Sequence, residues 1–187
     1  MSRIYLLVLI AAVAVLLLAA AAPPSSYPQF TKDNELLRPA DYRDWVFLSS
    51  GLGMAYGDPP DHQMFTNAFV PQWAYHEFLS NGKWPDRTIF VVEDRGSESK
   101  GSINKFGHFQ TDLMGIGVEV KDETRFPEKW AYFNFGQDNK TASANPKPAC
   151  WQCHEDHAAV EHSFVQFYPT LKPVAQKFGT YKSAVEN

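Results

Sequence analysis

Cys150-Trp151-Gln152-Cys153-His154 is the stretch of sequence around which the rest of this chain has to fold. Two thiols three positions apart, followed directly by a histidine, form the pattern that attaches a c-type haem. Each thiol adds to one haem vinyl group as a thioether, and the adjacent imidazole becomes the axial iron ligand. The motif contains both cysteines of the sequence. We therefore predict one covalently bound haem c, held by Cys150 and Cys153, with His154 as the iron ligand.

Two other interpretations of the motif are weaker. A thioredoxin-like dithiol is expected beside a βαβ pattern, which does not surround this motif, and it leaves the histidine unexplained. A structural zinc site needs four ligands, and His157 and His162 could add two nitrogens to the two thiols. Ligand count alone therefore leaves zinc open. With haem bound, we expect His157 and His162 to lie at the surface or behind His154.

The N-terminus has the pattern of an export signal. Arg3 supplies a positive charge, residues 4–18 form an unbroken apolar run, and Ala19, Ala20 and Ala21 then supply small residues for cleavage. Residues 1–22 are thus predicted to be a signal peptide, or an uncleaved membrane anchor, because residues 4–22 almost suffice to span a bilayer. Residues 23–33 are expected to be a flexible tether and residues 34–187 one haem domain. The expected location is the periplasm or another exported compartment, where haem c is attached.

The charge balance argues against a nucleic-acid partner. The sequence has 17 Lys and Arg residues against 21 Asp and Glu residues, a formal net charge of −4. Binding to phosphates requires a basic surface. Aromatic residues make up 14% of the chain, which suits a β-rich core and a haem pocket equally well.

Hydrophobic patterning predicts a mostly β body ahead of the motif. Strands are expected at residues 44–50, 65–70, 88–93, 106–121 and 130–135. Pro71 is placed in the first turn of a helix that runs to about Asn81 and stops at Gly82. Further helices are expected over residues 150–162 and after Pro169, and loops over residues 51–61, 95–104 and 137–148.

The motif lies close to the C-terminus, and no methionine follows it. Small electron-transfer cytochromes instead carry the motif near the N-terminus and use a downstream methionine as sixth iron ligand. The upstream candidates for that role are each more simply core, loop or surface residues; they are Met54, Met64, Met114, His62 and His108. The order of the elements favours an iron that is open on the side away from His154.

Several segments resemble the cytochrome P-460 / cytochrome c-prime-beta family. They are Arg38-Pro39, Tyr42 to Val46, Tyr75 to Phe78, Val120 to Asp122, Arg125-Phe126, Trp130 to Phe133, Cys150 to His154, and Phe164 to Leu171. The resemblance covers about residues 34–171. It implies an α+β fold, with an antiparallel sheet of about five strands flanked by helices and haem c near the C-terminus. It also implies a homodimer.

The departures from this family bear on function. Its P-460 enzymes oxidise hydroxylamine, with a lysine cross-linked to the haem and a carboxylate beside the open iron site. The resemblance puts that lysine at Val92, which has no amine, and the carboxylate at Gly117. Glu119 would face the same side of the strand, but a solvated surface position is the simpler expectation. The chain thus resembles members that lack the cross-link, keep an apolar cap and bind nitric oxide and carbon monoxide. Candidates for that cap are Phe47, Phe69, Phe90 and Val92.

Three functions follow, in order of preference. The first is a five-coordinate haem c protein that binds nitric oxide or a similar gas. The second is a periplasmic oxidoreductase that acts on hydroxylamine or nitric oxide, for which no catalytic residue is assigned. The third is a six-coordinate electron carrier. The expected partners are a small diatomic or nitrogenous ligand and a redox protein, with membrane contact only through residues 4–22, if they are retained.

Overall fold

The computed structural model describes residues 26–54 and 62–186. The predicted signal or anchor at residues 1–22 and most of the predicted loop at residues 51–61 lie outside the described residues. Among the described helices, none combines the length and the apolar character needed to cross a bilayer.

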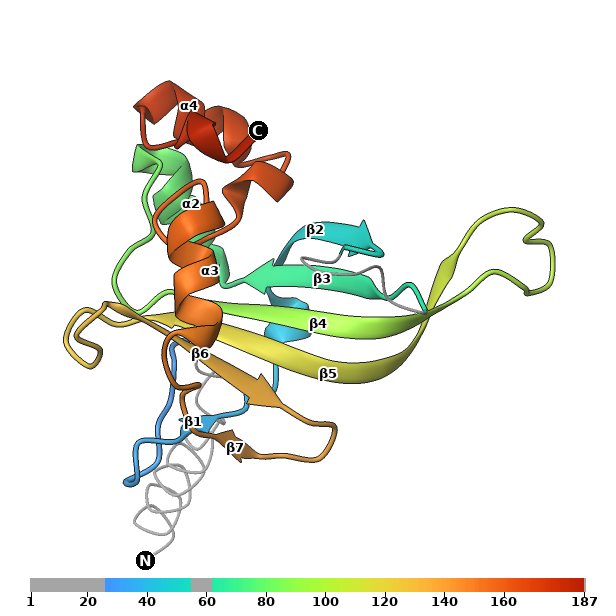
Figure 1. Cartoon of the computed structure of the whole chain (residues 1–187), viewed down its shortest axis with the longest axis horizontal. Coiled ribbons are helices and arrows are strands. Elements are labelled where there is room, and N and C mark those ends of the chain that lie inside the picture. Colours follow the sequence, from blue (N-terminus) through green and yellow to red (C-terminus); the bar gives the residue numbers. More distant parts are fainter. Residues whose placement is uncertain (1–25, 55–61, 187) are drawn as a thin grey trace, which may run out of the picture.

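The centre of the fold is a five-stranded antiparallel sheet in the order β2-β3-β4-β5-β6, in which every strand pairs with the next one along the chain (Figure 1). The strands are β2 (Val46–Leu52), β3 (Phe65–Val70), β4 (Ile89–Glu98), β5 (Phe109–Lys121) and β6 (Trp130–Phe135). Two short strands, β1 (Leu36–Leu37) and β7 (Thr141–Ala142), pair separately. The predicted α+β fold with about five antiparallel strands is confirmed.

Three α-helices are described: α2 (Gln72–Asn81), α3 (Ala149–His157) and α4 (Lys172–Phe178). Short 3-10 turns lie at η1 (Tyr42–Asp44), η2 (Val165–Phe167) and η3 (Ser183–Glu186). Helix α2 ends as predicted, because Gly82 takes the left-handed conformation with φ of 72° and donates its N–H to the Phe78 carbonyl. The three helices pack on one face of the sheet, which we call the helix face (Figure 1).

Alternation of side chains along the strands gives the sheet two apolar faces. On the helix face, Val70, Phe90 and Trp130 form a core with residues of α2 and α4. On the opposite face, Val91, Val118 and other strand residues pack against segments that precede β2, and we call this the N-terminal face. Because both faces are covered, even polar side chains on the central strands become buried.

The start of the described chain lies against this body. Trp73 Nε1 donates a hydrogen bond to the Ser26 carbonyl at 3.2 Å, and the Tyr27 ring stacks on Trp73 with centroids 4.6 Å apart. Phe30 packs against the core of the N-terminal face and forms a bridge to Leu36. These residues belong to the stretch predicted as a tether, and from Ser26 onward that stretch is packed.

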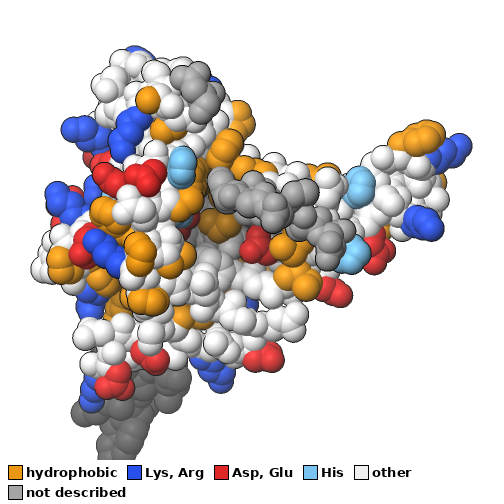
Figure 2. Space-filling model, viewed as in Figure 1, with side chains coloured by type: hydrophobic (Ala, Val, Ile, Leu, Met, Phe, Trp, Pro, Cys, Tyr) orange, Lys and Arg blue, Asp and Glu red, His pale blue; other side chains and the backbone are white. Residues whose placement is uncertain are grey.

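The strand β4 is longer than predicted. Residues 95–98, expected in a loop, pair with the first half of β5 to form a hairpin arm that projects from the body (Figures 1 and 2). The polar residues of this stretch are typical of a loop, but strand pairing satisfies their backbone groups. The prediction of a loop over residues 95–104 was therefore wrong for its first four residues.

The helix of the haem motif is shorter than predicted and ends at His157 instead of His162. Ala158 is extended, and Glu161 has a positive φ of 51°. The Glu161 carboxylate accepts hydrogen bonds from the buried Lys121 Nζ at 3.0 and 3.1 Å. This contact with β5 favours a turn where the local sequence favours more helix, because tertiary contacts override a weak propensity.

Candidate functional site

A cavity of about 470 Å³ lies between the helix face of the sheet and the haem-motif helix. All five strands contribute to its wall, and α3 and the segment after it close the other side. Its lining includes Val92, Gly117, Glu119, Tyr132, Cys150 and His154. The structure thus brings the predicted iron ligand and one predicted haem thiol to a single cavity.

The His154 imidazole is held in one orientation and one tautomer. Its Nδ1 lies 2.7 Å from the carbonyl oxygen of His162, which can only accept, so Nδ1 carries the proton. The ring lies between the rings of Tyr132 and Phe164, with centroid distances of 4.3 and 4.5 Å. Nε2 therefore keeps its lone pair for a metal ion, as it does in histidines that bind metals.

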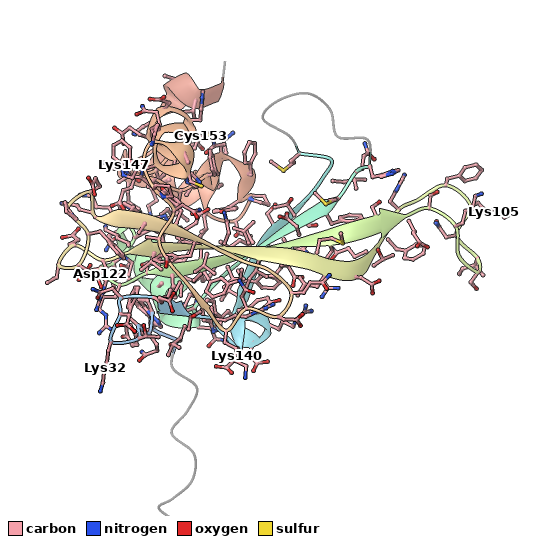
Figure 3. The ribbon with its side chains drawn as sticks, turned by 60° about the horizontal axis from the view of Figure 1, so that its bottom comes forward. Lys32, Lys105, Asp122, Lys140, Lys147 and Cys153 are labelled. Atoms are coloured by element: carbon pink, nitrogen blue, oxygen red, sulfur yellow. The ribbon has the colours of Figure 1, made fainter. Side chains whose placement is uncertain are left out.

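The two cysteines lie on successive turns of α3 and are both half-buried free thiols. Cys150 lines the cavity with His154, four residues further along the same helix face. Its sulfur accepts a hydrogen bond from Asn145 Nδ2 at 3.4 Å. Burial raises the pKa of the Cys153 thiol, and the neighbouring Cys150 and Asp156 raise it further. Figure 3 labels Cys153 on the helix above the sheet.

Glu119 is buried, so the expectation of a solvated surface position was wrong. Its exposed fraction is 8%, and Oε1 lies 3.8 Å from His154 Nε2. Burial raises the pKa of this carboxyl, and only a protonated His154 would oppose that shift. The alternation Val118-Glu119-Val120-Lys121 is typical of a strand with one buried and one solvent-exposed face. Here α3 covers the face that this pattern assigns to solvent.

Tyr132 is the cross-strand partner of Glu119 and was not predicted as a site residue. Its hydroxyl and Glu119 Oε2 are buried, and neither has a hydrogen-bond partner among the described residues. Burial raises the pKa of the Tyr132 hydroxyl above its usual range. Buried polar atoms without partners are rare, and they mark a place where a bound group or water completes the site. Together with the free Nε2 of His154, these atoms fit a haem in this cavity.

Val92 and Gly117 are cross-strand partners, and both line the cavity. A Cβ added to Gly117 would meet no atom closer than 3.9 Å, so the space beside it is open. These are the two positions where the resemblance puts the lysine and the carboxylate of the P-460 enzymes. The chain therefore presents a valine and a glycine at adjacent points of the wall.

Three of the four predicted cap residues do not form the wall. Phe47 and Phe69 pair with each other, and Phe69 packs with Tyr42 on the N-terminal face. Phe90 is fully buried in the core between Trp84 and Trp130. Only Val92 lines the cavity, because the register of β4 places it on the helix face beyond Phe90.

The candidates for a sixth iron ligand separate into two groups. Met54 and Met64 line the cavity, whereas Met114, His62 and His108 are not among its lining residues. His108 Nδ1 instead lies 3.0 Å from Ser97 Oγ on the hairpin arm. Sequence spacing could not separate these residues, because it does not show that Met54, after β2, and Met64, before β3, both reach the cavity.

His162 is buried next to His154, on the side of Nδ1, which agrees with the second of the two predicted positions. Its ring packs near Trp151 and Trp130, and Nε2 lies 3.1 Å from a carboxylate oxygen of Glu155. Burial lowers the pKa of His162 to about 4, against the attraction of Glu155. Within the described ranges, no group of three or more His, Cys, Asp or Glu residues is arranged to hold a metal ion. The zinc alternative therefore gains no support from the geometry.

Asp94 and Thr66 line the end of the cavity beyond Val92. Thr66 Oγ1 donates a hydrogen bond to Asp94 Oδ1 at 2.9 Å, and burial raises the pKa of this carboxyl. The sequence did not predict this pair, because the predicted strand ended at Glu93 and Asp94 was therefore not assigned to either face of the sheet.

Comparison with protein-family models identifies the family of this chain. The family model described as Cytochrome P460 matches residues 39–165, about two thirds of the chain, including the five-stranded sheet, most of the cavity wall and the haem motif. No curated protein matches the chain. The chain therefore belongs to the cytochrome P460 family, which implies a haem cofactor.

Proposed function

We propose that this chain is an exported monohaem c-type cytochrome whose iron binds small uncharged ligands such as nitric oxide. Cys150 and Cys153 would hold the haem through thioethers, and His154 would be the only protein ligand of the iron. The observation that carries this proposal is the His154 imidazole. Its Nδ1 proton is committed to the His162 carbonyl, and its Nε2 lone pair is available at the cavity.

The bound haem would supply an iron centre that exchanges electrons and binds diatomic gases. The residues of the chain orient that centre and shape the space around it. Tyr132 and Phe164 hold the imidazole between their rings. Val92, Gly117 and Ala68 form a small apolar patch on the sheet side of the cavity, between Glu119 and the pair of Asp94 and Thr66. Such a surface excludes water and accepts uncharged ligands at little desolvation cost.

Val92 and Gly117 favour binding over hydroxylamine oxidation, because neither side chain can form a cross-link or accept a proton. The buried Glu119 favours oxidation as a second candidate. A carboxylate with a raised pKa near the iron ligand is the kind of group that takes protons from a reacting nitrogen. The thioethers of Met54 and Met64 at the cavity favour the third candidate, a six-coordinate electron carrier.

Spectra of the purified haem-loaded protein separate the three candidates. We expect a high-spin five-coordinate ferrous spectrum and ready binding of carbon monoxide. A low-spin ferrous spectrum without added ligand would exclude the first two candidates, and Met54→Ala and Met64→Ala variants would then identify the sulfur. Steady turnover of hydroxylamine with an electron acceptor, lost in Glu119→Gln, would favour the oxidoreductase. The homodimer, the redox partner and the exported location stay predictions.

A further inference from the structure

The end of the hairpin arm carries the two most exposed large hydrophobic side chains of the described residues. Ile103 is 93% exposed and Phe106 is 94% exposed, whereas the next values are 54% for Phe47 and 53% for Met114. Both lie in the turn between β4 and β5, away from the body (Figures 1 and 2). Single exposed apolar residues are ordinary, but two large apolar side chains that are almost fully exposed in one turn indicate a contact surface.

The arm tip, residues 99–108, is held in shape from within. Asn104 Nδ2 donates hydrogen bonds to the carbonyls of Ser99 and Gly107 at 2.6 and 2.8 Å, and its Oδ1 accepts one from the Gly107 N–H at 3.0 Å. The Asn104 N–H also bonds to the Gly101 carbonyl at 2.8 Å. The polar side chain thus points into the turn while its apolar neighbours point out. A turn ordered in this way presents Ile103 and Phe106 without a further ordering cost.

The arm tip is basic although the chain is acidic. Residues 99–108 contain Lys100 and Lys105 and no Asp or Glu, whereas the whole sequence has a net charge of −4. Both lysines are exposed, and Lys105 lies at the far end of the arm in Figure 3. Bulky apolar side chains next to lysines are the combination that binds an anionic lipid surface, where the apolar groups enter the interface and the amines meet headgroups.

We propose that the arm tip docks the protein on an anionic membrane surface, with Ile103 and Phe106 inserted and Lys100 and Lys105 at the lipid phosphates. The shape of the tip favours a membrane over a protein partner. A stable protein interface buries about 1,200 Å² or more, which a narrow tip with two apolar side chains cannot supply alone. A lipid interface needs no matching hollow. The proposal does not depend on the haem, because no residue of the arm tip lines the cavity.

Amide hydrogen exchange of the full haem-loaded chain tests the proposal at the tip itself. The readout is local, so an N-terminal segment that also binds lipid does not affect it. We expect slower exchange over residues 99–108 with vesicles that mix phosphatidylcholine and phosphatidylglycerol than in buffer, and little slowing with phosphatidylcholine alone. An unchanged exchange rate with the mixed vesicles would overturn the proposal.

Paired variants identify the groups that make the contact. Ile103→Ser with Phe106→Ser should abolish the protection, since each side chain contributes more than about tenfold to membrane partitioning. Lys100→Ser with Lys105→Ser should weaken the affinity for the mixed vesicles by about 30-fold, at roughly 1 kcal/mol of binding free energy per lysine. The matched control is Lys32→Ser with Lys140→Ser, at two exposed lysines on the body (Figure 3). It should leave the protection of residues 99–108 by the mixed vesicles unchanged. Equal effects of the two lysine pairs would contradict the proposal.

A second copy of the chain is the competing occupant of the arm tip. Contact between copies would protect residues 99–108 in buffer without vesicles, and more so at higher protein concentration. The Ile103→Ser, Phe106→Ser variant would then lower the molar mass measured by light scattering. That pair of results would overturn the membrane proposal and assign the arm to a protein interface.

Discussion

At the scale of single residues, the position of Val92 sets what the cavity can hold. It lies on the helix face of β4 and lines the cavity, and the space next to its partner Gly117 is open. A larger side chain at position 92 should therefore extend into the cavity. With the haem bound as we propose, the size of this residue would set the space left for a ligand at the iron.

We expect Val92→Phe to slow carbon monoxide binding to the ferrous protein by at least about tenfold, equivalent to about 1.4 kcal/mol of barrier. Val92→Ala is the matched control and should leave the rate unchanged or raise it. Flash photolysis measures both rates. If the phenylalanine variant binds at the wild-type rate, the ligand does not approach along this wall.

His162 gives a second prediction at this scale, for the pH dependence of stability. Its pKa in the folded chain, about 4, lies below the ordinary histidine value of 6.5, because burial disfavours the charged ring. Between these values the unfolded chain binds more protons than the folded one. Stability should therefore fall as the pH drops from 6.5 to 4, by at most about 1.4 kcal/mol per pH unit.

Urea unfolding between pH 4 and 7 measures this slope, with His162→Asn as the comparison. The variant keeps the main-chain carbonyl that accepts from His154 and lacks the titrating ring. Groups such as Glu119 titrate in both proteins, so the difference between the two slopes isolates His162. Equal slopes would mean that His162 titrates alike in the folded and unfolded chains.

At the scale of elements, two helices end at glycines with nearly equal geometry. Gly82 after α2 has a φ of 72°, and Gly179 after α4 has a φ of 69°. Their surroundings differ. A Cβ on Gly82 would lie 2.9 Å from atoms of Phe178 and Thr180, whereas one on Gly179 would meet nothing within 4 Å. The first glycine therefore serves both a backbone conformation and a close approach between α2 and α4.

We expect Gly179→Ala to lower the unfolding free energy by about 1 kcal/mol, the cost of left-handed backbone with a side chain. Gly82→Ala should cost about 2–3 kcal/mol, because steric overlap adds to the same conformational cost. Chemical denaturation of both variants provides the comparison. Equal losses would show that α4 moves away from α2 at no cost.

At the scale of the whole molecule, the cavity connects the haem to the stability of the fold. It leaves Glu119 Oε2 and the Tyr132 hydroxyl buried without partners among the described residues. A group that binds only the folded chain stabilises it by mass action, and a covalent group does so permanently. The chain without haem should consequently be less stable than the chain with it.

The variant Cys150→Ser, Cys153→Ser should lose covalent haem, seen as no haem stain after denaturing electrophoresis, and should unfold at a lower temperature. Adding Glu119→Leu to this variant should recover stability, by about 1–3 kcal/mol, because it removes an unpartnered buried carboxyl. Circular dichroism during heating measures both changes. Retention of the stain in the double serine variant would refute covalent attachment through these thiols.

The sequence alone determined the local features of this protein. Gly82 ended a helix because glycine takes the left-handed conformation at little cost. Residues 65–70 and 130–135 formed strands because β-branched and aromatic residues favour extended pairing. The Cys150 to His154 pattern carried the haem prediction and, with its neighbours, the family. These properties depend on residues close together in the chain.

Only the tertiary structure decided which side chains meet at the cavity. Strand register put Val92 on the helix face and Phe69 on the other, and the cover of α3 turned Glu119 from an expected surface residue into a buried one. The haem-motif helix ends at His157, and in the segment after it Glu161 contacts Lys121 of β5 while the His162 carbonyl contacts His154. Burial, pKa and ligand geometry depend on which distant segments pack together, and local sequence does not encode that directly.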